Sequence, residues 1–72
     1  MHITVNGVAR AIRATTLAQA LDELDYHQAI VATAVNGRFV AASQRHTTAL
    51  AEGDALEILA PMQGGSAMNL YD

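Results

Sequence analysis

The 72-residue chain contains no cysteine, no lysine and no tryptophan, and only one proline. Without cysteine, it cannot form a disulfide, ligate an iron–sulfur cluster or zinc ribbon, or use a thiol as a nucleophile. Its four basic residues are outnumbered by seven acidic ones, which gives a net charge of −3. There is no basic stripe to hold a phosphate backbone, and two tyrosines and one phenylalanine are too few for a base-stacking platform. Nucleic acid is therefore not an expected partner.

The chain also lacks a long hydrophobic run. Its apolar stretches are no longer than four residues, as at residues 29–32, which end at Thr33, whereas a membrane-spanning helix needs about 20 apolar residues. The N-terminus does not show the basic region and apolar run of a signal peptide, so we expect a cytoplasmic protein. Hydrophobic residues make up 51% of the chain and charged residues 15%, which favours one small folded domain over a disordered segment.

Two Asn-Gly pairs predict two β-hairpins, because both central residues of the favoured two-residue turn need positive φ. Asn6-Gly7 connects residues 2–5 with residues 8–13, and Asn36-Gly37 connects residues 29–35 with residues 38–40. We expect residues 29–35 to form an internal strand of the sheet. The first turn pairs Val5 with Val8 and gives one face that is expected to cover the core, made by Met1, Ile3, Val5, Val8 and Ile12.

A short helix is predicted between the hairpins, from Leu17 to about Asp25. Thr16 and Gln19 have the spacing of a capping box, and the leucines at 17, 21 and 24 share one helix face. Residues 43–48 are expected to be irregular, Leu50 to anchor a turn, and residues 55–59 to form the last strand. This order predicts an α+β fold with a mixed sheet of four or five strands on one helix. It is the order of the ubiquitin-like β-grasp fold, in which the last strand lies beside the first.

No catalytic or metal-binding constellation can be assembled from the sequence. The histidines at positions 2, 27 and 46 are not spaced as metal ligands, and neither serine has a base beside it. The acidic residues at 22, 23 and 25 are expected to form a solvated face near the helix end. We therefore expect no catalytic residue and no metal in this chain. Docking to partners is expected to use the exposed sheet face, with small residues such as Ala9, Ala11, Ala32, Ala34, Ala41 and Ala42.

The segment after the last strand is the informative one. Pro61 ends the strand because proline cannot donate to a ladder, and Gly64-Gly65 follows. A glycine pair here is consistent with a loose chain end. It is equally consistent with a carrier tail, since residues without Cβ can thread a narrow enzyme channel and approach a nucleotide. A carboxylate at the end of such a tail could be activated as an acyl-adenylate and then converted to a thiocarboxylate.

A series of short segments resembles the ThiS family, the bacterial sulfur carriers of thiamine biosynthesis. The resemblance covers residues 1–65 and lies in their order and spacing. The matching residues are Ile3-Thr4-Val5-Asn6-Gly7, Thr16-Leu17, Val35-Asn36-Gly37, Phe39-Val40, Leu50-Ala51-Glu52-Gly53-Asp54, Leu56-Glu57-Ile58 and Pro61-Met62-Gln63-Gly64-Gly65.

The resemblance implies a ubiquitin-like β-grasp carrier domain over residues 1–65 and a C-terminal extension over residues 66–72. It implies that Gly65 is adenylated and carries the sulfur, and that Pro61, Met62, Gln63 and Gly64 enter the partner enzymes with it. The implied partners are an adenylating enzyme of the ubiquitin-activating type (ThiF-like), which uses ATP, and thiazole synthase (ThiG-like). This chain itself would bind no cofactor.

Two departures from the family pattern matter. Ala41-Ala42 stands where members often have Pro-Arg, and Ser66–Asp72 follows the glycine at which members normally end. We expect a protease to remove residues 66–72; an added segment or a lost carrier function are the alternatives. Two other functions stay open on the sequence: the small subunit of molybdopterin synthase, and a non-carrier β-grasp binding module of the TGS type.

Overall fold

The computed structural model describes residues 1–26 and 30–60. The elements follow the predicted order, with one addition, a 3₁₀ helix. They are β1 (His2–Val5), β2 (Val8–Ala11), α1 (Leu17–Glu23), β3 (Ala32–Val35), β4 (Arg38–Val40), the 3₁₀ helix η1 (Ala42–Thr47) and β5 (Ala55–Leu59).

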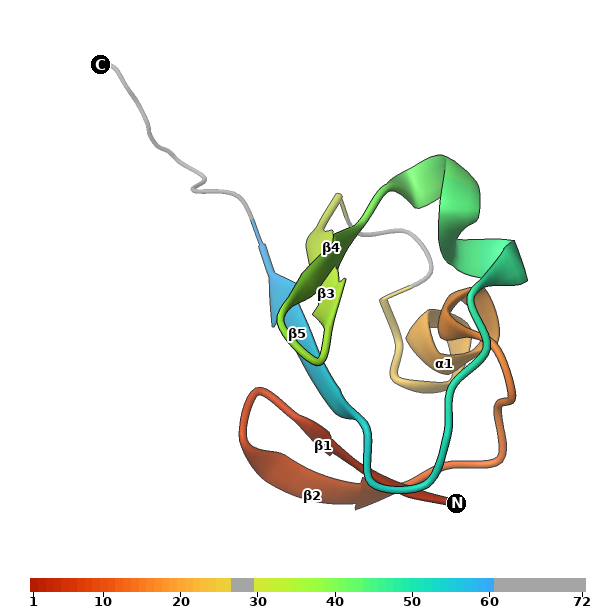
Figure 1. The fold of residues 1–72 in the computed structure, drawn as a ribbon, viewed down its shortest axis with the longest axis vertical. Helices are drawn as coiled ribbons and strands as arrows, with labels where there is room; N and C mark the ends of the chain where they lie inside the picture. Colours follow the sequence, from red (N-terminus) through yellow and green to blue (C-terminus); the bar gives the residue numbers. More distant parts are fainter. Residues whose placement is uncertain (27–29, 61–72) are drawn as a thin grey trace.

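The five strands form one mixed sheet in the order β2-β1-β5-β3-β4. Two antiparallel hairpins, β1–β2 and β3–β4, lie on either side of β5 (Figure 1). As predicted, the last strand lies beside the first, since β5 runs parallel to β1 and antiparallel to β3. The strand predicted over residues 29–35 is β3; it is internal, but the middle of the sheet is β5.

Both predicted hairpin turns are present. Asn6 and Gly7 have φ of 50° and 83°, and Asn36 and Gly37 have φ of 53° and 82°, the left-handed values that two-residue turns require. The predicted pairing of Val5 with Val8 is confirmed.

The placement of Val8 in the core was wrong, because its side chain is 62% exposed. All four residues of β2 are exposed. This strand is the edge of the sheet, where the face shared with Ile3 and Val5 extends beyond the cover of the helix.

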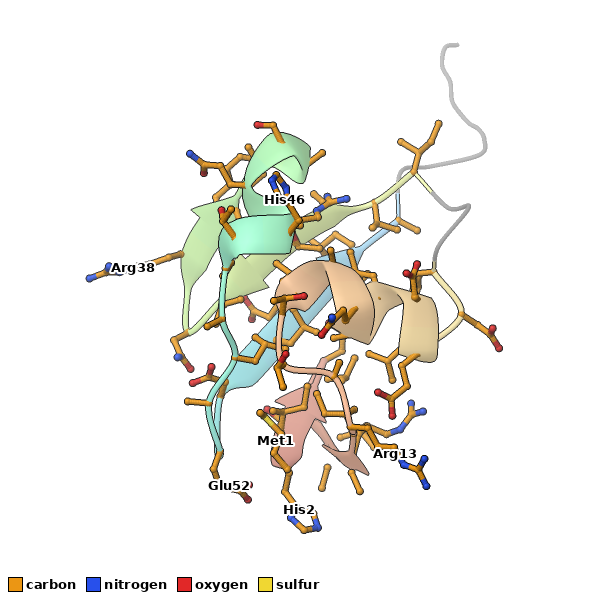
Figure 2. The ribbon with its side chains drawn as sticks, turned by 90° about the vertical axis from the view of Figure 1, so that its right-hand side faces the viewer. Met1, His2, Arg13, Arg38, His46 and Glu52 are labelled. Atoms are coloured by element: carbon orange, nitrogen blue, oxygen red, sulfur yellow. The ribbon has the colours of Figure 1, made fainter. Side chains whose placement is uncertain are left out.

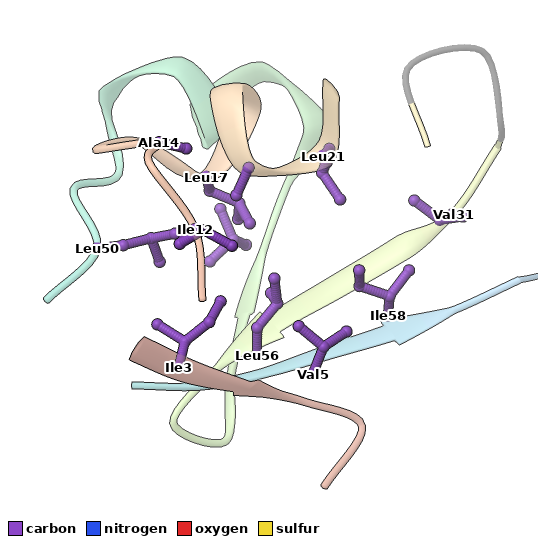
Figure 3. Close-up of a cluster of buried hydrophobic side chains, with 12 residues drawn as sticks. Ile3, Val5, Ile12, Ala14, Leu17, Leu21, Val31, Leu50, Leu56 and Ile58 are labelled. Atoms are coloured by element: carbon purple, nitrogen blue, oxygen red, sulfur yellow. The ribbon is translucent and has the colours of Figure 1, made fainter. Parts of the chain in front are cut away.

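The core lies between the sheet and α1 (Figure 3). Ile3 from β1 and Leu56 from β5 point toward Leu17 of the helix, and all three side chains are almost fully buried. The leucine spacing predicted this helix face for Leu17 and Leu21, whereas Leu24 is only partly buried. The core is thus built from one face of the sheet and leaves the other face without a helix among the described residues.

The helix begins as predicted and ends two residues before Asp25, at Glu23. Thr16 Oγ1 accepts the backbone N–H of Gln19 at 3.3 Å, and the Gln19 amide oxygen accepts the backbone N–H of Thr16 at 3.3 Å. Glu23 is exposed, as expected for a solvated face, but it also makes contacts that the sequence did not predict. Its carboxylate accepts backbone N–H groups of Arg13 and Ala14 at 2.9–3.0 Å, which closes the segment before the helix onto the helix end.

Residues 43–48 were expected to be irregular, but most of them belong to η1. Arg45 of η1 donates from Nε to Thr33 Oγ1 at 3.1 Å and from Nη2 to the carbonyl of Val31 at 2.6 Å. The buried Thr33 hydroxyl in turn donates to the carbonyl of Val40 at 2.9 Å. These bonds attach η1 to the β3–β4 hairpin. Leu50 is buried beyond η1, as predicted for an anchor.

Candidate functional site

The predicted carrier residues Pro61, Met62, Gln63, Gly64 and Gly65 lie outside the described residues. The structure does define the point from which they extend, because β5 ends at Leu59 and Ala60 is the last residue described. Gly65 lies six positions beyond Leu59, and a fully extended chain of that length spans about 20 Å. Gly65 is therefore confined to within about 20 Å of the C-terminal end of the central strand.

The strand that leads into the tail is held by asparagine side chains from both hairpin turns. Asn6 Nδ2 donates to the carbonyl of Ile58 at 3.0 Å, and the backbone N–H of Ile58 donates to Asn6 Oδ1 at 2.8 Å. Asn36 Oδ1 accepts the backbone N–H of Ala55 at 2.9 Å, while its Nδ2 donates to Asp54 Oδ1 at 3.0 Å. Sequence reasoning identified these residues only as turn formers.

The sheet face opposite α1 carries an exposed apolar area beside the C-terminal end of β5. By strand register, Glu57 on β5 pairs with Ala34 on β3, which pairs with Phe39 on β4, while Leu59 pairs with Ala32. Phe39 is 72% exposed and Leu59 is 68% exposed. With Thr33, the five outward-facing residues line a shallow hollow of about 80 Å³. We call this set the outer patch: Ala32, Ala34, Phe39, Glu57 and Leu59.

The alanines expected to form a docking surface divide into two groups. Ala9, Ala11, Ala32 and Ala34 lie on the strands and, by register, face away from the core. Ala41 and Ala42 instead lie at the start of η1. Ala42 lines a pocket of about 200 Å³ between α1 and η1, together with Arg45. Residues three apart on a 3₁₀ helix share a face, so Arg45 lies on the same face of η1 as Ala42.

No catalytic triad or metal site forms among residues 1–26 and 30–60. No group of three or more histidine or acidic side chains in these ranges could hold a metal ion. His2 and His46 lie at opposite ends of the molecule (Figure 2), and His27 is outside the described residues. His46 lines the α1–η1 pocket with Asp22 and Arg45, and no serine or threonine among the described residues lines that pocket. The described ranges likewise contain no helix long and apolar enough to cross a membrane.

Glu52 has a lowered pKa that reflects a structural role. The backbone N–H of His2 donates to Glu52 Oε1 at 2.9 Å and lowers the pKa of the carboxyl below its usual 4.5. The His2 imidazole Nδ1 lies 3.4 Å from Glu52 Oε2 and acts in the same direction. These contacts join the turn before β5 to the start of β1.

The family model of the ThiS family matches residues 3–65. The chain belongs to the ThiS family. The match ends at Gly65, so it includes the predicted tail and excludes Ser66–Asp72. No curated protein sequence matches the chain significantly.

Two solved structures support the same assignment. The crystal structure of the thiamine biosynthesis protein ThiS from Geobacter metallireducens has a TM-score of 0.77 and 30% identity, covering 90% of this chain and all of that one. An NMR solution structure of a thiamine biosynthesis protein from the same organism has a TM-score of 0.73 and 28% identity, covering 92% and 90% of the two chains. The predicted ubiquitin-like β-grasp fold of this ThiS-family chain is thereby confirmed.

Proposed function

We propose that this ThiS-family protein is the sulfur carrier for thiazole formation in thiamine biosynthesis. The observation that carries the proposal is the family match, which runs from Ile3 through the whole fold to Gly64-Gly65. Membership of the ThiS family favours a carrier on which partner enzymes act, rather than an enzyme.

The chemistry proceeds at the carboxyl group of Gly65. A ThiF-like adenylating enzyme binds ATP, and a Gly65 carboxylate oxygen attacks the α-phosphorus, which forms an acyl-adenylate and releases pyrophosphate. A persulfide, whose sulfur comes ultimately from cysteine through a desulfurase, then displaces AMP and gives an acyl disulfide. A thiol of the partner system cleaves its S–S bond, which releases the thiocarboxylate and leaves a disulfide. A ThiG-like thiazole synthase takes this sulfur into the thiazole ring. The chain needs no thiol of its own, because the sulfur is held on a carbonyl carbon.

The two halves of the molecule have different tasks in this scheme. Pro61, Met62, Gln63 and Gly64 enter the active sites of the partners, and the two glycines keep the end of the tail slim enough to lie beside the nucleotide. The exposed sheet face, with the outer patch next to the tail, docks on the partner in the cytoplasm. ATP belongs to the adenylating partner, and the carrier binds no cofactor.

The C-terminal extension sets a condition on this chemistry. Gly65 is joined by a peptide bond to Ser66, so its carboxyl group is not free to attack ATP. We propose that a protease hydrolyses this bond and removes Ser66–Asp72. Cleavage after Gly65, beyond the last strand, would leave the fold intact.

The test is the intact mass of the untagged protein, isolated from cells that express the full thiamine pathway. We expect a chain ending at Gly65, with a fraction shifted by one oxygen-to-sulfur exchange, and copurification with thiazole synthase. A Gly65→Ala variant should fold like the wild type yet gain no sulfur. A chain ending at Gly65 that is never adenylated would contradict the proposal, and copurification with a molybdopterin synthase large subunit would reassign the carrier.

A further inference from the structure

Glu57 is the one charged residue of the outer patch. It lies on the central strand with Ala34 and then Phe39 beside it across the sheet, and Leu59 follows two residues later on the same face. Among residues 1–26 and 30–60, the one ion pair joins His2 to Glu52, and no hydrogen bond is made by the Glu57 carboxylate. A free carboxylate thus stands between two large apolar side chains that are about 70% exposed.

A partner that covers Phe39 and Leu59 must also cover the Glu57 carboxylate, because the three residues line one shallow hollow. Taking a carboxylate out of water without a counter-charge costs several kcal/mol, which would offset much of the gain from apolar contact. A partner that places a lysine or arginine against Glu57 avoids this cost and still buries the apolar side chains. A partner with a wholly apolar surface is rejected.

We propose that Glu57 is a specificity-determining residue of this carrier: it selects an adenylating enzyme whose docking surface is apolar with one lysine or arginine at its centre. The inference rests on the proposed function and adds to it the chemistry of the partner surface. The position suits the task, because β5 carries both Glu57 and the root of the tail. The cation that meets Glu57 would therefore fix where the tail enters the enzyme.

A second copy of this chain is a poor occupant of the same surface. In a two-fold contact the same patch meets itself, so a contact centred on the outer patch would bring two Glu57 carboxylates together. Each chain also carries a net charge of −3. Both facts oppose self-association and favour a basic partner.

The test uses the carrier ending at Gly65 and the adenylating enzyme of the same organism. Calorimetric titration gives Kd for the wild type, Glu57→Gln and Glu57→Arg, at low and at raised salt. Asp22→Asn is the matched control, because Asp22 is an exposed acid on α1, in the layer opposite the outer patch. Thermal unfolding of each variant verifies the fold.

We expect Glu57→Gln to weaken binding about 30-fold or more and to reduce its salt dependence, as for loss of one partner of a covered ion pair. Glu57→Arg should weaken binding further, because it sets two cations against each other. Asp22→Asn should stay within about twofold of the wild type. Sulfur loading at saturating enzyme should remain possible for Glu57→Gln, because Gly65 is unchanged.

Wild-type affinity in both Glu57 variants would overturn the inference and leave the proposed function standing. A carrier dimer that forms through the outer patch in the presence of the enzyme, in place of the carrier–enzyme complex, would assign this surface to a second copy. That result would also overturn the inference. A wild-type chain ending at Gly65 that neither binds the enzyme nor gains sulfur would overturn the proposed function, and the inference with it.

Discussion

At the scale of single residues, the turn asparagines each serve two purposes. Asn6 adopts a left-handed backbone conformation, with φ of 50°, and its side chain makes two hydrogen bonds to the backbone of Ile58. Those bonds continue the pairing of β1 with β5 beyond Val5, where β1 ends. They hold the last residues of β5 before the tail. Glycine would satisfy the backbone conformation but not the hydrogen bonds.

Substitutions at Asn6 separate the two contributions. Asn6→Gly should lower the free energy of unfolding by about 1–2 kcal/mol, because two hydrogen bonds of the side chain are lost. Asn6→Ala should lower it by about 2–3 kcal/mol, because alanine also resists positive φ. Urea unfolding measures both, and equal losses for the two variants would contradict a backbone contribution.

The sequence predicts the turn at Asn6 but not the hydrogen bonds of the Asn6 side chain to β5. Asn-Gly identifies a two-residue turn from local conformational preference alone, and both turns are where they were predicted. The partner of the Asn6 side chain is 52 residues away, so it depends on β5 lying beside β1. The bond between Asn36 and Ala55 could not be predicted for the same reason, because the two residues are 19 positions apart.

At the scale of elements, α1 is a helix of seven residues and is therefore too short to be stable alone. It is held at its start by the Thr16–Gln19 capping box and at its end by Glu23, which binds the backbone of residues 13 and 14. The chain before the helix is thereby tied to both helix ends. This closure sets where Leu17 and Leu21 meet the sheet.

Removing the Glu23 carboxylate should destabilise the protein without changing its docking surface. Glu23→Ala leaves the backbone N–H groups of Arg13 and Ala14 without their acceptor, and we expect a loss of about 1–2 kcal/mol of unfolding free energy. Asp22→Ala is the control, because this neighbouring exposed acid accepts no such bonds through its side chain. Urea unfolding distinguishes them; equal small effects would show that the Glu23 contacts contribute nothing.

The two helices show how far local patterns reach. The capping box and leucine spacing predict α1, because all of its signals lie within nine residues. The 3₁₀ helix η1 was not predicted, because Ala42–Thr47 is polar and has no apolar period. Its attachment comes from Arg45, whose acceptors on Val31 and Thr33 are 14 and 12 residues away.

At the scale of the whole molecule, β5 divides its side chains between two tasks. Leu56 and Ile58 face the core, while Glu57 and Leu59 face the outer patch. One strand thus contributes to folding through alternate residues and, in the proposed function, to recognition through the others. Stability and partner binding should therefore respond to different substitutions in the same strand.

The two leucines of β5 test this division. Leu56→Ala should lower the unfolding free energy by about 3 kcal/mol, because it leaves a cavity in the core. Leu59→Ala should change it by no more than about 0.5 kcal/mol, yet weaken binding of the adenylating enzyme. Urea unfolding and calorimetric titration of both variants give the two readings, and a large stability loss in Leu59→Ala would contradict the division.

Element order, the helix core face and the place of the last strand beside the first were all predictable, the last from the β-grasp order; the parallel direction of that pair was not predicted. The exposure of Val8 was not, because alternation identifies a face of a strand but not how far the covering layer extends over it. The outer patch was foreseen only as small strand residues. Its two large apolar residues, Phe39 and Leu59, line one hollow only when β3, β4 and β5 lie side by side.

The central place of β5 has a consequence for synthesis of the protein. The ribosome makes both hairpins and the helix before it makes β5, and until then the two hairpins have no strand to join them. A nascent chain that stops short of residue 55 has no route to the native sheet, and it remains open to proteases. Every molecule that completes the fold has therefore been translated at least through Leu59. Chains that terminate earlier are excluded from the folded protein by the fold itself, and no separate quality-control factor is needed.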